Sequence, residues 1–217
     1  MRPPAQVSLA AREVSLGCCL VTYTLPPVVP AGRIAGMPQP VLKASGGLLL
    51  RPWAALDAPA LYQASLDPEI QKWNKWRLND EDEARATISG WREAWRQEAG
   101  AHWAVIRSGD RTLVGGMALI SMRLVRGVAE VAYWTAPWAR GAGVAPTALE
   151  TLAEFAIDQV GFHRLELVHS TANQVSCRVA LKCGFADEGV MRGVSPHDDG
   201  WHDAHLHARL AGDSGYW

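Results

Sequence analysis

The segment WARGAGVAPTALE, Trp138–Glu150, places two closely spaced glycines and a proline directly before a helical pattern of apolar residues. The first N–H groups of a helix have no intrahelical acceptor, and the helix dipole adds partial positive charge at that end. Gly141 and Gly143 let the backbone approach a bulky ligand, and Pro146 falls in the first turn, where a missing N–H is tolerated. The spacing predicts an anion cradle suited to a pyrophosphate. The alternative is a tight strand-to-helix turn.

Two familiar nucleotide loops are excluded at this position. The segment lacks the Lys-Ser/Thr pair with which a P-loop holds a nucleotide triphosphate and magnesium, and it is not a GxGxxG fingerprint. A pyrophosphate-nucleotide enzyme would also need an acidic ribose partner, for which the sequence offers no defensible position.

The segment SPHDDGWHDAHLHARL, Ser195–Leu210, contains four of the seven histidines and raises the question of a metal. Strand alternation sends His202 and His205 to opposite faces, and His207 is expected to face outward. The spacing matches no common zinc pattern. We therefore expect no metal, and we expect the segment to line the acceptor side of a groove, with Asp203 or His202 as a second candidate for a general base.

The elements around these residues alternate between strands and helices. The strands are expected at Gly46–Trp53, His102–Ser108, Thr112–Arg123, Gly127–Ala136, Arg164–Ser170, Phe185–Arg192 and Trp201–Leu210. The helices are expected at Asp57–Trp73, interrupted at Pro68, and at Asn79–Glu98, Ala145–Val160 and Asn173–Gly184. In the last helix, Asn173 is the expected N-cap and Gly184 the left-handed stop. The order indicates a mixed α/β fold with a strand–loop–helix–strand unit in its second half.

Residues 1–46 differ in composition from residues 47–217. They hold seven of the thirteen prolines, which predicts an extended or partly disordered N-terminal arm followed by one domain. The apolar stretch CCLVTYTLPPVVP would expose a sticky surface, so we expect the arm to cover part of the domain and to help form a homodimer.

Composition also limits the class of protein. The formal net charge of −1 gives no sign of a nucleic-acid partner, and no apolar run is long enough to span a membrane. The four cysteines form no paired framework, which favours a reducing cytoplasm over secretion.

The stretch from Ala129 to Gly193, with RGAGVA at Arg140–Ala145, resembles the GNAT superfamily of N-acetyltransferases, in its ribosomal-protein N-terminal acetyltransferase branch (RimJ/RimL type). The segments LLLRPW and DPEIQKW extend the resemblance, which covers about residues 47–210. It implies a V-shaped mixed sheet of six or seven strands flanked by helices. Acyl-CoA would enter between the strands that contain Glu130 and Arg164.

The resemblance also implies where acetyl-CoA binds. Its pantetheine would pair with exposed backbone near Trp134 and Thr135, and Asn173 and Ser176 would lie near the pantetheine and the thiol. Its pyrophosphate would bind the amides of the loop Arg140, Gly141, Ala142, Gly143, Val144, Ala145 and Pro146.

The catalytic residues are suggested by chemistry and by the same resemblance. Glu130, which alternates with Ala132 and Trp134, can accept the amine proton through water; alternatively it is an exposed residue or holds the cationic amine. Ser176 can protonate the leaving thiolate; alternatively its hydroxyl caps the helix. A backbone N–H on the splayed strand can meet the oxyanion.

We therefore expect an acetyl-CoA-dependent N-acetyltransferase whose acceptor is a primary amine, either a protein N-terminus or a small molecule. The same scaffold serves many amines, so the family does not decide the acceptor. The alternative is a non-catalytic acyl-CoA-binding or interaction module on the same fold, which would have lost the loop glycines or Asn173; both are present.

Overall fold

The computed structural model describes residues 26–74 and 76–213. Eight strands form one sheet in the order β1-β2-β3-β4-β5-β6-β8-β7. Their bounds are β1 Leu42–Ala44, β2 Leu48–Pro52, β3 Ala101–Arg107, β4 Leu113–Arg123, β5 Val128–Thr135, β6 Arg164–Ser170, β7 Ala186–His197 and β8 Gly200–Leu210. The helices are α1 Ala58–Ser65, α2 Pro68–Asn74, α3 Glu81–Arg96, α4 Val144–Glu154 and α5 Gln174–Lys182. A π-helical turn, Phe155–Val160, continues α4.

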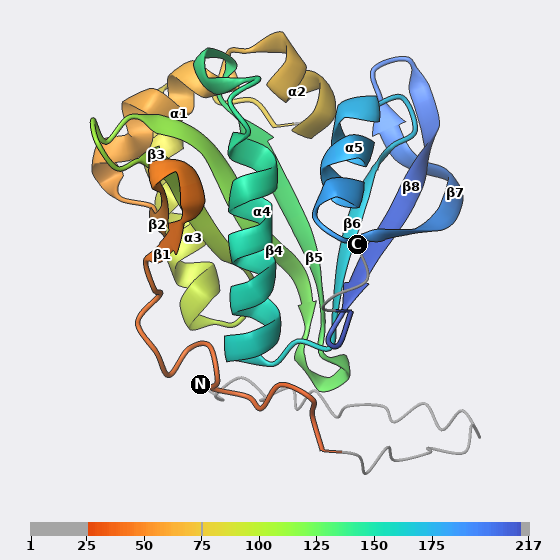
Figure 1. Cartoon of the computed structure of the whole chain (residues 1–217). Coiled ribbons are helices and arrows are strands. Elements are labelled where there is room, and N and C mark those ends of the chain that lie inside the picture. Colours follow the sequence, from red (N-terminus) through yellow and green to blue (C-terminus); the bar gives the residue numbers. More distant parts are fainter. Residues whose placement is uncertain (1–25, 75, 214–217) are drawn as a thin grey trace, which may run out of the picture.

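The pairing of β5 with β6 is short and sets the shape of the sheet. These two strands are parallel, and all other neighbouring strands are antiparallel. Only Val128–Glu130 pairs with Arg164–Glu166, although β5 continues to Thr135 and β6 to Ser170. Beyond Glu130 the two strands diverge, with α2 on one side and α5 on the other (Figure 1). The sheet is therefore open in its middle.

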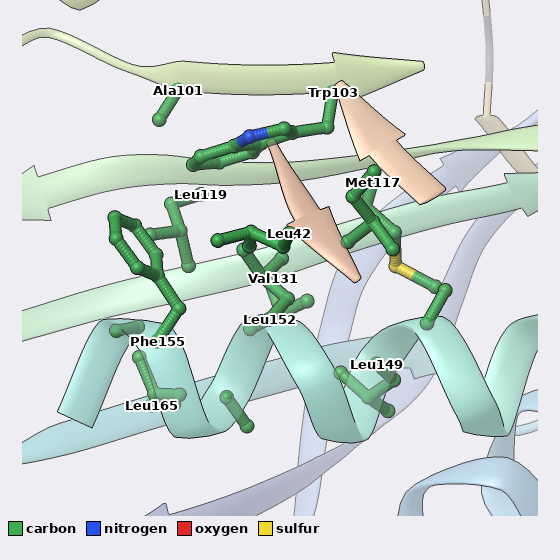
Figure 2. Close-up of a cluster of buried hydrophobic side chains, with 14 of the residues drawn as sticks. Leu42, Ala101, Trp103, Met117, Leu119, Val131, Leu149, Leu152, Phe155 and Leu165 are labelled. Atoms are coloured by element: carbon green, nitrogen blue, oxygen red, sulfur yellow. The ribbon is translucent and has the colours of Figure 1, made fainter. Parts of the chain in front are cut away.

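The main core fills the space between the sheet and α4. Leu149 and Leu152 of α4 and Phe155 of the following turn face Trp103 of β3 and Leu119 of β4 (Figure 2). A second cluster packs α1 and α3 on the sheet through Trp53, Leu61, Ile88, Ala104 and Ile106. The two clusters pack on the two faces of the sheet and fix the position of the strands that line the groove described below.

The expected fold class is confirmed, with two differences in detail. The sheet has eight strands instead of six or seven, because Leu42–Ala44 pairs with β2 as an additional edge strand. The strand expected to end at Arg192 continues to His197, because it stays paired with β8 through a register shift. The break at Pro68, the N-cap Asn173 and the left-handed Gly184 are all present.

The described part of the N-terminal arm, residues 26–46, packs on the domain. Val29 and Ile34 belong to the main core cluster. The indole N–H groups of Trp95 and Trp103 donate to the carbonyls of Met37 and Pro40, both at 3.0 Å. The boundary after residue 46 stays a prediction, and most of the apolar stretch that begins at Cys18 lies outside the described residues.

Glu98 attaches this arm to the end of α3. Its carboxylate accepts hydrogen bonds from the backbone N–H groups of Gly32, Ile34 and Ala35, at 2.8, 2.8 and 3.2 Å. Burial acts to raise the pKa of Glu98, but these three donors outweigh burial and hold the pKa below its usual value.

We expect Glu98→Gln to lower the free energy of unfolding by about 1–2 kcal/mol at pH 7, because a neutral amide accepts less strongly than a carboxylate. A depressed folded-state pKa contributes stability that is present above the unfolded pKa and is lost as the pH falls through the folded pKa. The difference between wild type and variant in urea denaturation should therefore shrink below about pH 4.5. A difference that persists undiminished at pH 3 would contradict this account.

None of the described helices has the length and apolar character needed to cross a bilayer.

Candidate active site

A groove of about 810 Å³ lies where β5 and β6 separate. Its walls come from β5, β6, the loop before α4, the start of α5 and the side of α2. The lining includes Glu69, Ile70, Trp73, Asn74, Glu130, Tyr133, Trp134, Thr135, Arg140, Gly141, Gly143, Val144, Ala145, Pro146, His169, Asn173 and Ser176. The break in strand pairing thus opens into a cavity large enough for an extended cofactor arm.

The loop before α4 forms one end of the groove. Gly141 and Gly143 have left-handed φ values of 77° and 73°, and Gly143 is the residue from which α4 begins. The Arg140 guanidinium is paired with Asp67 and holds the pKa of that carboxyl below its usual value. Because the Arg140 side chain is already paired, an anion bound by this loop is expected to contact the Arg140 backbone N–H. Ala142 is exposed and is not among the lining residues.

We expect Gly143→Val to weaken acetyl-CoA binding by at least about tenfold, or ~1.4 kcal/mol. A Cβ at this position meets no atom within 4 Å, so the loss comes from the left-handed backbone, which a β-branched residue strongly disfavours. Calorimetric titration with acetyl-CoA measures the effect. Gly212→Val is the matched control, because Gly212 has a φ of 102° and lies outside the groove. Equal acetyl-CoA affinities of the folded Gly143→Val and Gly212→Val variants would show that the loop is not part of the binding site.

The two faces of β5 carry different groups. Alternation places Glu130, Ala132 and Trp134 on one face and Val131 and Tyr133 on the other. The first face continues into a second groove of about 410 Å³, lined by four tryptophans (Trp53, Trp76, Trp91 and Trp134) together with Glu83 and His102. Gly116 permits this arrangement, because a Cβ there would lie 2.6 Å from the indole nitrogen of Trp134.

The other face of β5 meets α5. The hydroxyl oxygens of Tyr133 and Ser176 are 2.8 Å apart, and either can be the donor. Burial raises the pKa of Tyr133 to about 12, so the phenol keeps its proton at neutral pH. Ser176 is 8% exposed, and its backbone N–H donates to the Asn173 side chain at 3.1 Å. Asn173 thus caps α5, and the Ser176 hydroxyl is directed to Tyr133 instead of the helix end.

Glu130 and Glu166 are direct neighbours in the parallel register but have different environments. Glu166 pairs with Arg123 at 2.7 Å and with Arg164 at 2.9 Å. Burial raises the pKa of Glu130, and the negative charge of Glu166 raises it further, while Arg123 and the Ser121 hydroxyl act in the opposite direction. The raised pKa of Glu130 makes this carboxyl the candidate for proton transfer, whereas Glu166 is held in two ion pairs.

The structure brings most of the predicted site residues together. Glu130, Trp134, Thr135, Asn173, Ser176 and the loop residues other than Ala142 line one groove. The second candidates for the base lie elsewhere: Asp203 accepts from the Gly193 N–H at 2.8 Å, and His202 contacts Asp199 at 2.8 Å. From the histidine-rich segment, Ser195, Pro196, His197 and Ala204 reach the groove. The outward orientation expected for His207 is wrong, because His207 is fully buried beside His169.

Tyr133 is the site residue that sequence reasoning missed. The available signal was its position between Ala132 and Trp134, on the strand face opposite Glu130. Nothing in the sequence indicated that Ser176, 43 positions later, would meet its hydroxyl.

Comparison with known proteins agrees with this geometry. Residues 47–186 match the family model described as acetyltransferase (GNAT) domain. The chain is 26% identical over 175 residues to a ribosomal-protein-serine acetyltransferase of Escherichia coli, covering 78% of this chain and 96% of the relative. A RimL ribosomal L7/L12 α-N-protein acetyltransferase in complex with coenzyme A superposes with a TM-score of 0.75 at 20% identity, covering 81% of this chain and all of the other. RimJ of Mycobacterium smegmatis, with a coenzyme A disulfide, gives 0.72 at 23% identity, with 82% and 88% covered.

Proposed function

The chain belongs to the GNAT family of acetyltransferases and is an acetyl-CoA-dependent N-acetyltransferase; on that premise we propose that its acceptor is the α-amino group of a protein or peptide. Acetyl-CoA is the co-substrate. The observation that carries the proposal is the pair of grooves on either side of β5, which share Tyr133 and Trp134. Acetyl-CoA occupies the groove beside α4 and α5, and the acceptor enters from the tryptophan-lined groove.

The backbone of β5 supports this placement of the cofactor. The Ala136 N–H donates to the Val114 carbonyl on the β4 side, and Trp134 pairs with Gly116 in the same register. Because backbone groups alternate along a strand, those of Tyr133 and Thr135 are directed toward the open side. These are the positions at which the pantetheine can pair and at which an N–H can meet the oxyanion.

The chemistry divides between the two faces of β5. Glu130 lines the cofactor groove, on the face of β5 that continues into the acceptor groove, and accepts the proton of the attacking ammonium. The neutral amine attacks the thioester carbonyl, and the tetrahedral intermediate expels coenzyme A as a thiolate. The paired hydroxyls of Tyr133 and Ser176 give a proton to that sulfur on the cofactor side. The nitrogen releases its second proton to solvent, from which the hydroxyl pair regains the proton it gave. These steps use side chains and backbone of this chain and require no metal.

The lining of the acceptor groove favours a peptide over a polycationic small molecule. Its tryptophans offer apolar surface, and Glu83 is the one carboxylate among its described lining residues. Burial lowers the pKa of His102 to about 4, so this imidazole is neutral at physiological pH. Such a groove suits one ammonium group followed by a side chain with apolar surface. The relative from Escherichia coli, a ribosomal-protein-serine acetyltransferase, also supports a protein acceptor.

The experiment is acetyl-CoA turnover with a panel of amines, read by mass spectrometry. The panel contains peptides with free N-termini, the same peptides with blocked N-termini and an internal lysine, and small polyamines. We expect acetylation of the free α-amino groups alone. Faster turnover with polyamines would overturn the peptide assignment, and binding of acetyl-CoA without turnover of any amine would favour a non-catalytic module.

We expect Trp91→Ala to raise KM for a peptide acceptor about tenfold (~1.4 kcal/mol) and to leave KM for acetyl-CoA unchanged. The Trp91 ring stacks on His102 with centroids 5.0 Å apart, and its centroid lies 5.1 Å from that of Trp53. Trp201→Ala is the control, because Trp201 is exposed on the β8 strand and lines neither groove. An identical acceptor KM in both variants would show that the peptide does not use the tryptophan groove.

A homodimer and a cytoplasmic location are also part of this proposal. The dimer is motivated by the apolar N-terminal arm, and light scattering of the full chain and of a chain beginning at Pro26, which keeps Val29, Ile34 and β1, tests it. The cytoplasm is where a ribosomal-protein acceptor would be met.

A further inference from the structure

A cluster of imidazoles and one thiol lies between α5 and the strands β6, β8 and β7, and one of its members, His169, also lines the groove. His169 comes from β6, His205 and His207 from β8, Cys177 from α5 and Asp187 from β7. In Figure 1, α5 lies over β6 and β8, and the first turn of this helix borders the groove.

The imidazoles of this cluster have unsatisfied nitrogens in a buried position. His169 is 7% exposed and His207 is fully buried. Neither His169 Nε2 nor either nitrogen of His207 has a hydrogen-bond partner among the described residues. Burial lowers the pKa of His207, while the Asp187 carboxylate and the nearby Phe185 backbone act in the opposite direction. Buried polar atoms without partners are unfavourable and therefore call for a ligand or another explanation.

The hydrogen bonding of His169 prepares it as a ligand. Its Nδ1 lies 2.9 Å from the Ser170 carbonyl oxygen, which can only accept, so Nδ1 carries the proton. Nε2 is then left with a free lone pair directed into the cluster. Metal-binding histidines commonly donate their second N–H to a backbone carbonyl in this way, which fixes the tautomer and the ring orientation.

The candidate ligand atoms fall into two groups of three that share His207. Ligand atoms of His169, Cys177 and His207 all lie within 4.8 Å of one another, and those of Asp187, His205 and His207 do so as well. Tetrahedral zinc holds such atoms about 3.4–3.7 Å apart, so the side chains of the first group must move closer to bind an ion, and His205 or Asp187 must rotate toward that group to complete it. The His169 and His207 rings are stacked, with centroids 5.1 Å apart and an interplanar angle of 19°, so one ring must turn for both nitrogens to point at the ion.

We propose that His169, Cys177 and His207 form a zinc-type metal site that joins α5 to β6 and β8, with His205 or Asp187 as the fourth ligand. Cys177 binds as the thiolate and releases its proton to solvent. Nitrogen and sulfur ligands of this kind favour a borderline-soft ion such as Zn²⁺ over Mg²⁺ or Ca²⁺. The role is structural: the ion fixes the helix that presents Asn173 and Ser176 to the groove.

Co²⁺ titration of the metal-free full-length chain tests the site. The chain carries Cys18→Ser, Cys19→Ser and His202→Gln, which remove the two N-terminal thiols and the exposed group formed by His197, Asp199 and His202. We expect one equivalent of Co²⁺ to give tetrahedral d–d bands together with a thiolate-to-cobalt charge-transfer band, both abolished by added Zn²⁺. No such spectrum at one equivalent would overturn the proposal.

Matched cysteine variants identify the thiol. Cys177→Ser should remove the charge-transfer band and weaken Zn²⁺ binding at least about tenfold. Cys183→Ser should retain both, because Cys183 instead donates to the Pro146 carbonyl at 3.3 Å. A charge-transfer band that survives Cys177→Ser refutes the assignment. His169→Gln and His207→Gln should each weaken Zn²⁺ binding as well; if the buried His207 variant does not fold, the half-buried Cys177 decides the outcome.

Discussion

A Glu130→Gln enzyme is expected to lose about 10²–10³-fold in kcat with a peptide acceptor, and to change the slope of its pH–rate profile. The amide keeps the size of the carboxyl but cannot accept a proton. Because burial and the charge of Glu166 raise the pKa of Glu130, its ionisation should appear above the ordinary value of 4.5. The acceptor α-amino group must also lose a proton, near pH 8.

Because Glu130 and the acceptor amine must both lose a proton, the slope of the pH–rate profile shows whether Glu130 takes part. In the wild type, log kcat/KM should fall with a slope of about one below the amine pKa and about two below the pKa of Glu130. The variant should keep a slope of about one throughout. If Glu130 only holds the cationic amine, the loss will appear as a higher acceptor KM with an unchanged slope. A variant with wild-type kcat and wild-type slopes would leave proton removal to water.

Removing the hydroxyl pair on the other face of β5 is expected to have the second large effect. Ser176→Ala and Tyr133→Phe should each lower kcat by about 10–10²-fold and leave the affinity for acetyl-CoA nearly unchanged. The effect is at the low end for a general acid because a thiolate is a good leaving group. The two oxygens are 2.8 Å apart and act as a relay, so the double variant should be little slower than the slower single variant.

Steady-state rates with the four enzymes of this double-mutant cycle provide the measurement. Leu181→Ala is the control, because Leu181 also lies on α5, is 49% exposed and does not line the groove. Multiplicative losses in the double variant would show that the two hydroxyls act independently. Full activity in both single variants would mean that solvent protonates the thiolate.

Local patterns in the sequence were sufficient to predict the loop and the helices around it. Gly141, Gly143 and Pro146 have few backbone options, and Asn173 with Gly184 marks the two ends of α5, so these predictions depended on neighbours in the chain. The resemblance to a family supplied Glu130 and Ser176 as candidates. The features that the sequence did not predict depend on contacts between distant segments. The Tyr133–Ser176 pair follows from how α5 meets β5, and the burial of His207 follows from how α5 lies on β6 and β8. No local pattern encodes either arrangement.

The edge strand β1 was missed for a related reason. Leu42–Ala44 is too short and too close to the prolines of the arm to read as a strand. This segment forms a strand because its three residues pair with three residues of β2. In the same way, residues 26–46 read as an arm by composition, whereas Val29 and Ile34 are buried by partners far along the chain.

The short parallel register between β5 and β6 gives this protein an unpaired strand edge in its interior. Exposed edges usually occur at the margin of a sheet, where they invite pairing with other chains. Here the edge lies in the middle, and the pantetheine arm, with its two amide groups, is expected to bind along it as a surrogate strand. Acetyl-CoA then completes the sheet as well as reacting, so an excess of cofactor should raise the melting temperature. In the free protein, the same edge is the place where an extended peptide would add by strand pairing and compete with the cofactor.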